Sequence, residues 1–282
     1  MKGSFQSPRK SLGQNFLQDS NIIRKIVASL NIGVDDVVLE IGPGRGALTD
    51  QILPLARQLH VVEFDRDLSA YWRQRAESAP NLVVHEADIL KFELAGLLQG
   101  QSIAAEGAGK LKIIGNLPYN ISTPVLFHLM RYADQVDSQV LMLQKEVVLR
   151  MASPPGTKQY GRLSIMLQYR YAIENLFTVS PAAFIPPPKV ESAIVRLTPL
   201  PKIEHTVANT DDFSRIVKAA FSQRRKTLRN TLKGYLSVKQ IEIIGVHPTV
   251  RAETLAVEDF VKLANLYTKV KDDSYVVPGK ER

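Results

Sequence analysis

The sequence predicts a Rossmann-like α/β domain that is followed by a small all-helical domain. Two patterns support this prediction. Up to Pro199, short apolar runs alternate with amphipathic helical patterns, which is typical of parallel βαβ units with right-handed crossovers. At Pro199-Leu200-Pro201 the alternation stops, and only helical periodicity follows. We therefore expect an α/β domain over residues 1–199 and a helical domain over residues 200–282.

Seven apolar runs have the length and composition of buried strands. The predicted strands are Val37–Ile41, Leu59–Phe64, Leu82–His85, Leu111–Ile114, Gln139–Leu143, Ala172–Val179 and Ser192–Thr198. In open α/β sheets, ligands bind beyond the carboxyl ends of the strands. The residues that directly follow these strands are therefore candidates for a functional site.

The predicted helices show caps and apolar faces. Asp19 or Ser20 caps the first one, in which Ile22, Ile26 and Leu30 recur with the 3.6-residue period. Further helices of the first domain are predicted at Ala47–Arg57, at Leu68–Ala79, from Ser122 onward and at Lys145–Met151. Those of the second domain are predicted at Asp212–Phe221, Arg224–Leu236, Val238–Ile244 and Val257–Val270. The Gly- and Ala-rich segment 100–109 is expected to be an exposed connection.

Composition excludes several kinds of site. The 282 residues include no cysteine, which excludes disulfides and thiolate catalysis, and the five histidines lack metal-ligand spacing, so we expect no metal. The net charge of +8 favours a polyanionic partner, nucleic acid before membrane. No apolar run approaches membrane-spanning length and the N-terminus has no apolar signal region, so we expect a cytoplasmic protein.

A glycine-rich loop, Gly42-Pro43-Gly44-Arg45-Gly46, links the first predicted β-strand of the sheet to a helix. Glycines in this position let the backbone approach a ligand closely. The loop is one residue shorter than the dinucleotide fingerprint Gly-x-Gly-x-x-Gly. The shorter spacing disfavours a pyrophosphate and favours a nucleoside without phosphates.

Acidic residues end the next two strands. Glu63 lies 21 residues after Gly42, where a carboxylate can accept hydrogen bonds from both hydroxyls of a ribose. Asp88 ends the third strand and can accept a hydrogen bond from an adenine amine. A glycine loop followed by two strand-end acids predicts a pocket for S-adenosylmethionine.

The stretch Asn116-Leu117-Pro118-Tyr119 ends the fourth strand, beside this pocket. The Asn116 side-chain oxygen and the Leu117 carbonyl can accept both hydrogens of an adenine N6 and favour a nucleophilic nitrogen. Pro118 stiffens the turn, and Tyr119 can stack on the base. A flipped base is held between two faces, and Phe184 is a candidate for the second. Lys189, at the end of a proline-rich segment, can contact a phosphate.

Six motifs occur in order and carry a family resemblance. They are Leu12–Leu17, Glu40–Gly44, Glu63–Asp67, Gly115–Ser122, Leu143–Val147 and Phe184–Val190. The set resembles the ribosomal RNA adenine dimethyltransferase family, specifically its bacterial small-subunit (16S) enzymes. The likeness extends from about Arg9 to Leu232.

The resemblance implies a class I methyltransferase sheet and dimethylation of two adjacent adenosines in the 3′-terminal stem-loop of 16S rRNA. The methyl groups would come from S-adenosylmethionine, and the enzyme would act in small-subunit biogenesis. The partner would be 16S rRNA within the small subunit or its precursor, and we expect a monomeric enzyme. The cofactor-binding positions implied by motif match are Asn15, Leu17, Gly42, Glu63, Asp88 and Asn116.

Seven basic residues and no acidic one occupy positions 215–233. They are Arg215, Lys218, Arg224, Arg225, Lys226, Arg229 and Lys233. We expect Arg224, Arg225, Lys226 and Arg229 to bind RNA phosphates with salt-sensitive affinity. Such contacts position the RNA without selecting the adenosine.

Three other functions compete with this hypothesis. A large-subunit rRNA methyltransferase of the antibiotic-resistance type would share the catalytic domain, but the proline-rich segment and the basic run fit the 16S enzyme better. A non-catalytic RNA-binding assembly factor would have no reason to keep Asn116–Tyr119. A nicotinamide dehydrogenase is disfavoured by the short glycine loop.

Overall fold

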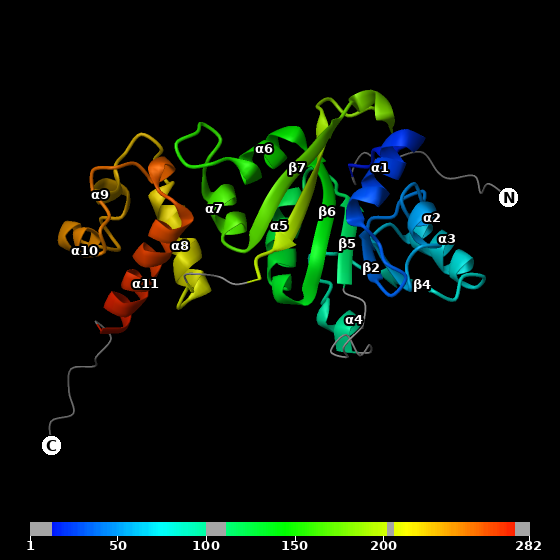
Figure 1. Cartoon of the computed structure of the whole chain (residues 1–282), viewed down its shortest axis with the longest axis horizontal. Helices are drawn as coiled ribbons and strands as arrows, with labels where there is room; N and C mark the ends of the chain where they lie inside the picture. The colour runs from blue at the N-terminus through cyan, green and yellow to red at the C-terminus, as the bar shows by residue number, and fades with distance from the viewer. Residues whose placement is uncertain (1–12, 100–110, 202–205, 274–282) are drawn as a thin grey trace, which may run out of the picture. The chain divides into compact units, whose positions relative to one another are not determined.

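The computed structural model describes residues 13–99, 111–201 and 206–273. It divides into two compact units (Figure 1). The sheet unit comprises the residues up to Val148 together with Tyr171–Pro199, and the helical unit comprises Leu149–Arg170 together with the residues from Leu200. The predicted connection 100–109 lies outside the described residues.

A seven-stranded sheet forms the centre of the sheet unit, in the order β4-β3-β2-β5-β6-β9-β7. The first five strands in this order are parallel, and β9 and β7 are antiparallel to their neighbours. The strands are β2 (Val37–Ile41), β3 (Gln58–Glu63), β4 (Leu82–Glu86), β5 (Leu111–Asn116), β6 (Val136–Gln144), β7 (Tyr171–Val179) and β9 (Ser192–Pro199). All seven predicted strands are confirmed, with ends that differ by a few residues.

Both faces of this sheet are covered. A hydrophobic cluster on one face joins Val38 of β2 and Ile114 of β5 to Trp72 and to apolar residues of the neighbouring helices. Leu39 and Ile113, which point to the opposite face, have no exposed surface. Continuous apolar strands are expected where a parallel sheet is buried on both sides.

The helices of the sheet unit are α1 (Ser20–Leu30), α2 (Thr49–Ile52), α3 (Arg66–Ala76), α4 (Ala95–Gln99) and α5 (Ser122–Met130). The Asp19 side chain caps α1, as predicted, by accepting from the backbone N–H groups of Asn21 and Ile22. The predicted helix Ala47–Arg57 is wrong in extent, because only Thr49–Ile52 is helical and the flanking residues form turns.

A second, two-stranded sheet joins two distant segments. β1 (Phe16–Leu17) pairs antiparallel with β8 (Phe184–Ile185). The backbone N–H of Gln18 extends this pairing by donating to the Ala183 carbonyl at 2.8 Å. The N-terminal segment is thereby fixed to the proline-rich part of the chain.

In the helical unit, α8 (Thr210–Ala220) packs on α11 (Val257–Asp273) and on α7 (Arg162–Gln168). The rings of Tyr169 and Phe213 lie 4.9 Å apart. This packing explains why Leu149–Arg170, which the sequence pattern placed in the first domain, groups with the C-terminal helices. α6 (Lys145–Ala152) spans the change from one unit to the other.

The predicted helix Arg224–Leu236 is wrong in extent, because only α9 (Leu228–Thr231) is helical. Thr227 instead forms a β-bridge with Arg251, and the Leu228 N–H donates to the Val250 carbonyl at 2.9 Å. The bridge holds Thr227 in an extended conformation, so α9 begins only at Leu228. The helices predicted at 212–221, 238–244 and 257–270 are confirmed, the middle one as α10 (Val238–Ile243).

Candidate functional site

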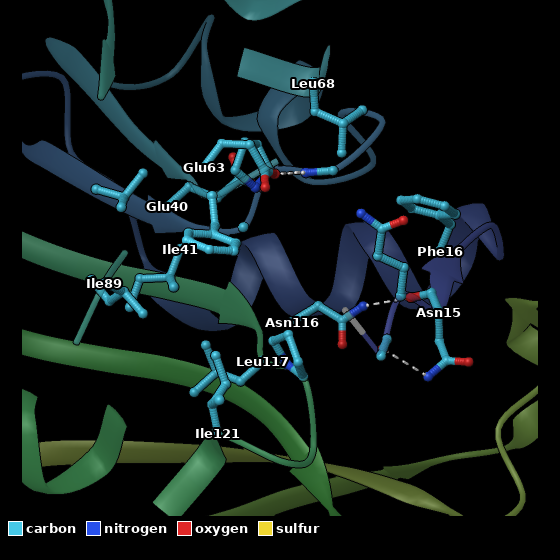
Figure 2. A pocket seen from close by; sticks show the side chains of 18 of the residues that line it. Asn15, Phe16, Glu40, Ile41, Glu63, Leu68, Ile89, Asn116, Leu117 and Ile121 are labelled. Atoms are coloured by element: carbon cyan, nitrogen blue, oxygen red, sulfur yellow. Dashed lines mark hydrogen bonds between the residues drawn. The ribbon is translucent and has the colours of Figure 1, made fainter. Parts of the chain in front are cut away.

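A cavity of about 310 Å³ lies at the carboxyl ends of β2, β3, β4 and β5. Its walls come entirely from the sheet unit. They comprise the segment 13–17, the glycine loop and the residues that follow the three other strands (Figure 2). The candidate residues that line it are Asn15, Leu17, Gly42, Glu63, Asp88, Asn116, Leu117, Pro118 and Tyr119.

The glycine loop has the backbone conformation that its sequence suggested. Gly42 has a φ of +67°, and a Cβ added there would meet nothing within 4 Å, so the backbone borders open space. Gly46 has a φ of +93°, and its Cβ would lie 2.8 Å from the Trp72 ring. Trp72 also donates from its indole nitrogen to the Gly44 carbonyl at 3.0 Å. Trp72 therefore packs against the loop at Gly44 and Gly46, and Gly42 leaves the loop open toward the cavity.

Glu63 is a buried carboxylate whose two oxygens are fixed by backbone donors. Oε1 accepts from the Asp65 N–H at 2.9 Å, and Oε2 accepts from the Gly44 N–H at 3.2 Å. Burial raises the pKa of Glu63, and these hydrogen bonds partly offset the increase. Each oxygen keeps a further lone pair for a ligand hydroxyl.

Asp88 and two apolar neighbours form the wall beyond β3 and β4. Asp88 Oδ1 accepts from the Leu90 N–H at 3.0 Å. Phe64 and Ile89 also line the cavity, and Phe64 is 61% exposed. The sequence patterns assigned neither of these two residues a role. Their position in the sequence could have identified them, because Phe64 directly follows Glu63 and Ile89 directly follows Asp88.

The N-terminal segment forms the wall opposite the strand ends. Its Asn15 carbonyl accepts from Asn116 Nδ2 at 3.0 Å, as Figure 2 shows. The Phe16 ring lies against the glycine loop, 4.3 Å from the guanidinium of Arg45, in a cation–π contact. Leu17 is buried, and its backbone pairs with Phe184.

Asn116 is oriented by its contact with Asn15. Because Nδ2 donates to the Asn15 carbonyl, the hydrogen-bond network places Oδ1 on the other side of the amide. Oδ1 has no hydrogen-bond partner among the residues that the structure describes. The turn that follows is also fixed, since the Pro118 carbonyl accepts from the Ile121 N–H and from the Ser122 hydroxyl. The amide is therefore presented as an acceptor.

The two predicted stacking residues differ in their placement. Tyr119 is half-buried, lines the cavity and shares a 2.7 Å hydrogen bond with Ser192. Phe184 is 2% exposed and belongs to the hydrophobic cluster that contains Leu17 and Ile194. It does not line the cavity. The structure therefore does not bring Phe184 to the predicted position, because its backbone pairs with β1 and its ring is enclosed by the core.

Glu40 is a further acid in the cavity wall, and the sequence patterns gave it no role. It is 1% exposed, and its Oε2 has no hydrogen-bond partner within the described part of the chain. Burial raises the pKa of Glu40 to about 8, with smaller contributions from Asp50 and Glu63, while Thr49 partly offsets the increase. The signal in the sequence was an acid inside an otherwise apolar strand.

The predicted RNA-binding residues lie on the surface. All seven basic residues of positions 215–233 are exposed, as is Lys189 of the sheet unit. Arg224 already has partners, since Nε pairs with Glu253 Oε2 at 2.9 Å and the guanidinium also donates to the Lys158 carbonyl. The β-bridge at Thr227 brings the exposed Arg251 beside the basic run. Only the fold could reveal this addition.

Within the described residues, no group of three or more His, Asp or Glu side chains is arranged to hold a metal ion. The described helices also include none long and apolar enough to cross a membrane.

The cavity fits a nucleoside that carries no phosphate. Gly42 leaves room for close approach, Glu63 presents a carboxylate that backbone donors fix, and Asp88 lines the same wall as Phe64 and Ile89. A seven-stranded Rossmann-like sheet with such a cavity and with Asn116 at the end of β5 defines an S-adenosylmethionine-dependent methyltransferase.

Residues 5–269 match the family model for ribosomal RNA adenine dimethylase. The chain belongs to this family. It is 51% identical over 259 residues to the ribosomal RNA small subunit methyltransferase A of Laribacter hongkongensis, covering 92% of this chain and 95% of the relative. The protein of the same name from Pseudomonas aeruginosa is 48% identical over 257 residues, covering 91% and 93%.

Two solved structures share the fold of this chain. A dimethyladenosine transferase from Plasmodium falciparum superposes with a TM-score of 0.75 and 28% identity, covering 90% of this chain and 98% of that one. The 23S rRNA methyltransferase ErmE superposes with a TM-score of 0.68 at 24% identity, covering 90% and 100%, which shows a shared fold.

Proposed function

We propose that the protein transfers methyl groups from S-adenosylmethionine to N6 of two adjacent adenosines in the 3′-terminal stem-loop of 16S rRNA. Each adenosine receives two methyl groups. The partner is 16S rRNA within the small ribosomal subunit or its precursor, and the reaction belongs to the biogenesis of that subunit. We further propose that the enzyme acts as a monomer in the cytoplasm, where its substrate is assembled.

The observation that carries the proposal is the orientation of Asn116. Its amide nitrogen is engaged by the Asn15 carbonyl, so the amide acts toward a substrate as an acceptor. An adenine amine has two hydrogens to donate, and the Asn116 Oδ1 and the Leu117 carbonyl are proposed to accept one each. This arrangement draws the nitrogen toward a tetrahedral geometry and stabilises the positive charge that grows on it.

When bound, S-adenosylmethionine supplies an electrophilic methyl group. Residues 116–119 orient the adenine N6, which is the nucleophile, toward this methyl group. Pro118 limits the motion of the turn, and Tyr119 stacks on the base, so that the amine is aligned for in-line attack. Phe184 can stack on the second face of the base only when the pairing of β1 with β8 opens, because its ring is enclosed in the structure described.

The other walls of the cavity are proposed to hold the cofactor. Glu63 accepts hydrogen bonds from the ribose hydroxyls, and Asp88 accepts one from the adenine amine. Gly42 permits close contact with the backbone, while Asn15 and Leu17 cover the cofactor from the opposite side. Phe64 and Ile89 supply the apolar faces for its adenine.

The helical unit is proposed to bind RNA. Arg225, Lys226 and Arg229 are exposed on it and contact phosphates, with Arg251 beside them. Arg224 contributes charge and also anchors the segment through Glu253. Lys189 of the sheet unit adds a phosphate contact near the proline-rich segment. Such contacts position the RNA, and the splayed loop bases determine which adenosine enters the cavity.

The test is methylation in vitro. Small-subunit particles that lack the 3′-terminal methyl groups are incubated with the protein and labelled S-adenosylmethionine, with protein-free large-subunit rRNA as the parallel substrate. Mass spectrometry of the 16S 3′ fragment is expected to show N6,N6-dimethylation of both adenosines. Label confined to the large-subunit rRNA would contradict the proposal. Sedimentation of the protein alone checks the monomer.

A further inference from the structure

The Tyr119 side chain forms one hydrogen bond with β9, a strand that β6 separates from β5 in the sheet. Its hydroxyl lies 2.7 Å from Ser192 Oγ, an ordinary length for a bond between two hydroxyls. Ser192 is the first residue of β9 and has no exposed surface. Tyr119 is half-buried in the turn after β5 and lines the cavity.

The two ends of this bond differ in how firmly the chain holds them. Ser192 pairs with Gln144 of β6 on one side and with Val179 of β7 on the other. The preceding residue is also fixed, because the Glu191 carbonyl accepts from the Lys145 N–H at 3.0 Å and their side chains form an ion pair at 2.9 Å. Tyr119 belongs to a turn and has no strand partner. Ser192 is thus the fixed end, and the tyrosine ring is the end that it restrains.

We propose that Ser192 is a positioning residue for methyl transfer, which holds the Tyr119 ring at the position where it stacks on the acceptor base. The proposal rests on the function proposed above, because it needs Tyr119 to contact the base. The hydroxyl of a tyrosine lies on the axis of the second side-chain torsion, so only rotation about the first torsion, at the Cα–Cβ bond, displaces it. The bond to Ser192 therefore restrains the first torsion, and with it the position of the ring in the cavity.

The restraint is expected to act on the chemical step. The proposed cofactor contacts lie on other walls of the cavity, and Ser192 itself does not line the cavity. A ring that can swing about the first torsion still offers a surface to the base, but it aligns the amine in a smaller fraction of encounters. Loss of the bond should therefore lower kcat and leave the KM for the particle and the Kd for S-adenosylmethionine unchanged.

The experiment compares Ser192→Ala, Tyr119→Phe and the double variant with the wild type on undermethylated small-subunit particles. Each single variant is expected to lower kcat by roughly tenfold, since both remove the same restraint. The double variant is expected to be no slower than the slower single variant, because the two changes break one bond. Calorimetry with S-adenosylmethionine should give the wild-type Kd throughout.

A matched control is Ser164→Ala. Ser164 also has no exposed surface and donates from Oγ to the Arg150 carbonyl, but it lies in α7 of the helical unit. This variant should melt at a lower temperature and keep the wild-type kcat. A destabilising effect of losing a buried serine is thereby separated from an effect on the tyrosine.

Wild-type kcat in Ser192→Ala or in Tyr119→Phe would overturn the inference and leave the proposed function intact. Additive losses in the double variant would also overturn it. If Ser192→Ala does not fold, Tyr119→Phe tests the same bond from the turn. Failure of the wild type to methylate the particles would instead overturn the proposed function, and the role of Ser192 with it.

Discussion

Glu40 is a carboxylic acid in surroundings that favour its neutral form. Burial raises its pKa to about 8, whereas an unfolded chain holds a glutamate near 4.5. Between these two values the folded protein keeps a proton that the unfolded chain has lost. The contribution of Glu40 to the free energy of unfolding should therefore fall as the pH rises through this window and level off above pH 8.

Replacing Glu40 with glutamine should remove this dependence, because an amide has no proton to lose. At pH 7 the variant should be more stable than the wild type by about 3 kcal/mol, and near pH 4.5 the two should be equal. Urea titrations at pH 5 and pH 8 measure the difference. Glu63, whose pKa is also raised, titrates in both proteins, so only its interaction with Glu40 enters the difference. A difference that is the same at both pH values would contradict the assignment.

Tyr119 is the residue whose loss should separate binding from chemistry. Tyr119→Ala removes the whole ring, so methyl transfer should become undetectable while the Kd for S-adenosylmethionine changes little. Calorimetry and a single-turnover methylation assay measure the two quantities. Wild-type turnover in this variant would refute the stacking role.

The glycine loop is the element most sensitive to an added atom. In Gly46→Ala, the new Cβ would meet the Trp72 ring at 2.8 Å, on a backbone whose φ of +93° disfavours any side chain. The strain and the clash together should lower the free energy of unfolding by about 2–4 kcal/mol. Gly156→Ala is the control, because Gly156 has a φ of +85° with open space around it. An equal loss in both variants would mean that the contact with Trp72 carries no cost.

Some elements could be predicted from the sequence alone and others could not. The strands were predictable because each is an apolar run, and the Gly, Glu, Asp or Asn that follows the run marks where the strand ends. The residues at these strand ends also form most of the cavity wall. The helix expected over Arg224–Leu236 was not, since Thr227 pairs with Arg251, a contact that no local pattern encodes. The burial of Phe184 and the bond from Tyr119 to Ser192 likewise depend on segments distant in the chain.

At the scale of the whole molecule, the cavity and the exposed basic run belong to different units. The cavity belongs entirely to the sheet unit, and the exposed basic run to the helical unit. Substitutions in the basic run should therefore change RNA affinity without changing cofactor affinity. Net charge alone indicated a polyanionic partner, and the structure places all the basic residues of this run on the helical unit.

Replacing Arg224, Arg225 and Lys226 together with alanine should weaken RNA binding and flatten its salt dependence. For every phosphate that is no longer neutralised, the slope of log K against log salt should decrease by about 0.7 to 0.9. Filter binding over a range of salt concentrations measures this slope. The double variant Arg225→Ala with Lys226→Ala is the matched control, because it keeps the ion pair of Arg224 with Glu253. An unchanged slope would mean that these residues face away from the RNA.

The pairing of β1 with β8 also limits when the enzyme can first become competent during its own synthesis. Phe16 is among the first of the described residues to be made, yet its partner Ile185 is added much later. Until then the segment that carries the Asn15 carbonyl has no strand to pair with, and Asn116 lacks its fixed acceptor. The nascent chain should therefore acquire its full affinity for S-adenosylmethionine only after β8 has left the ribosome.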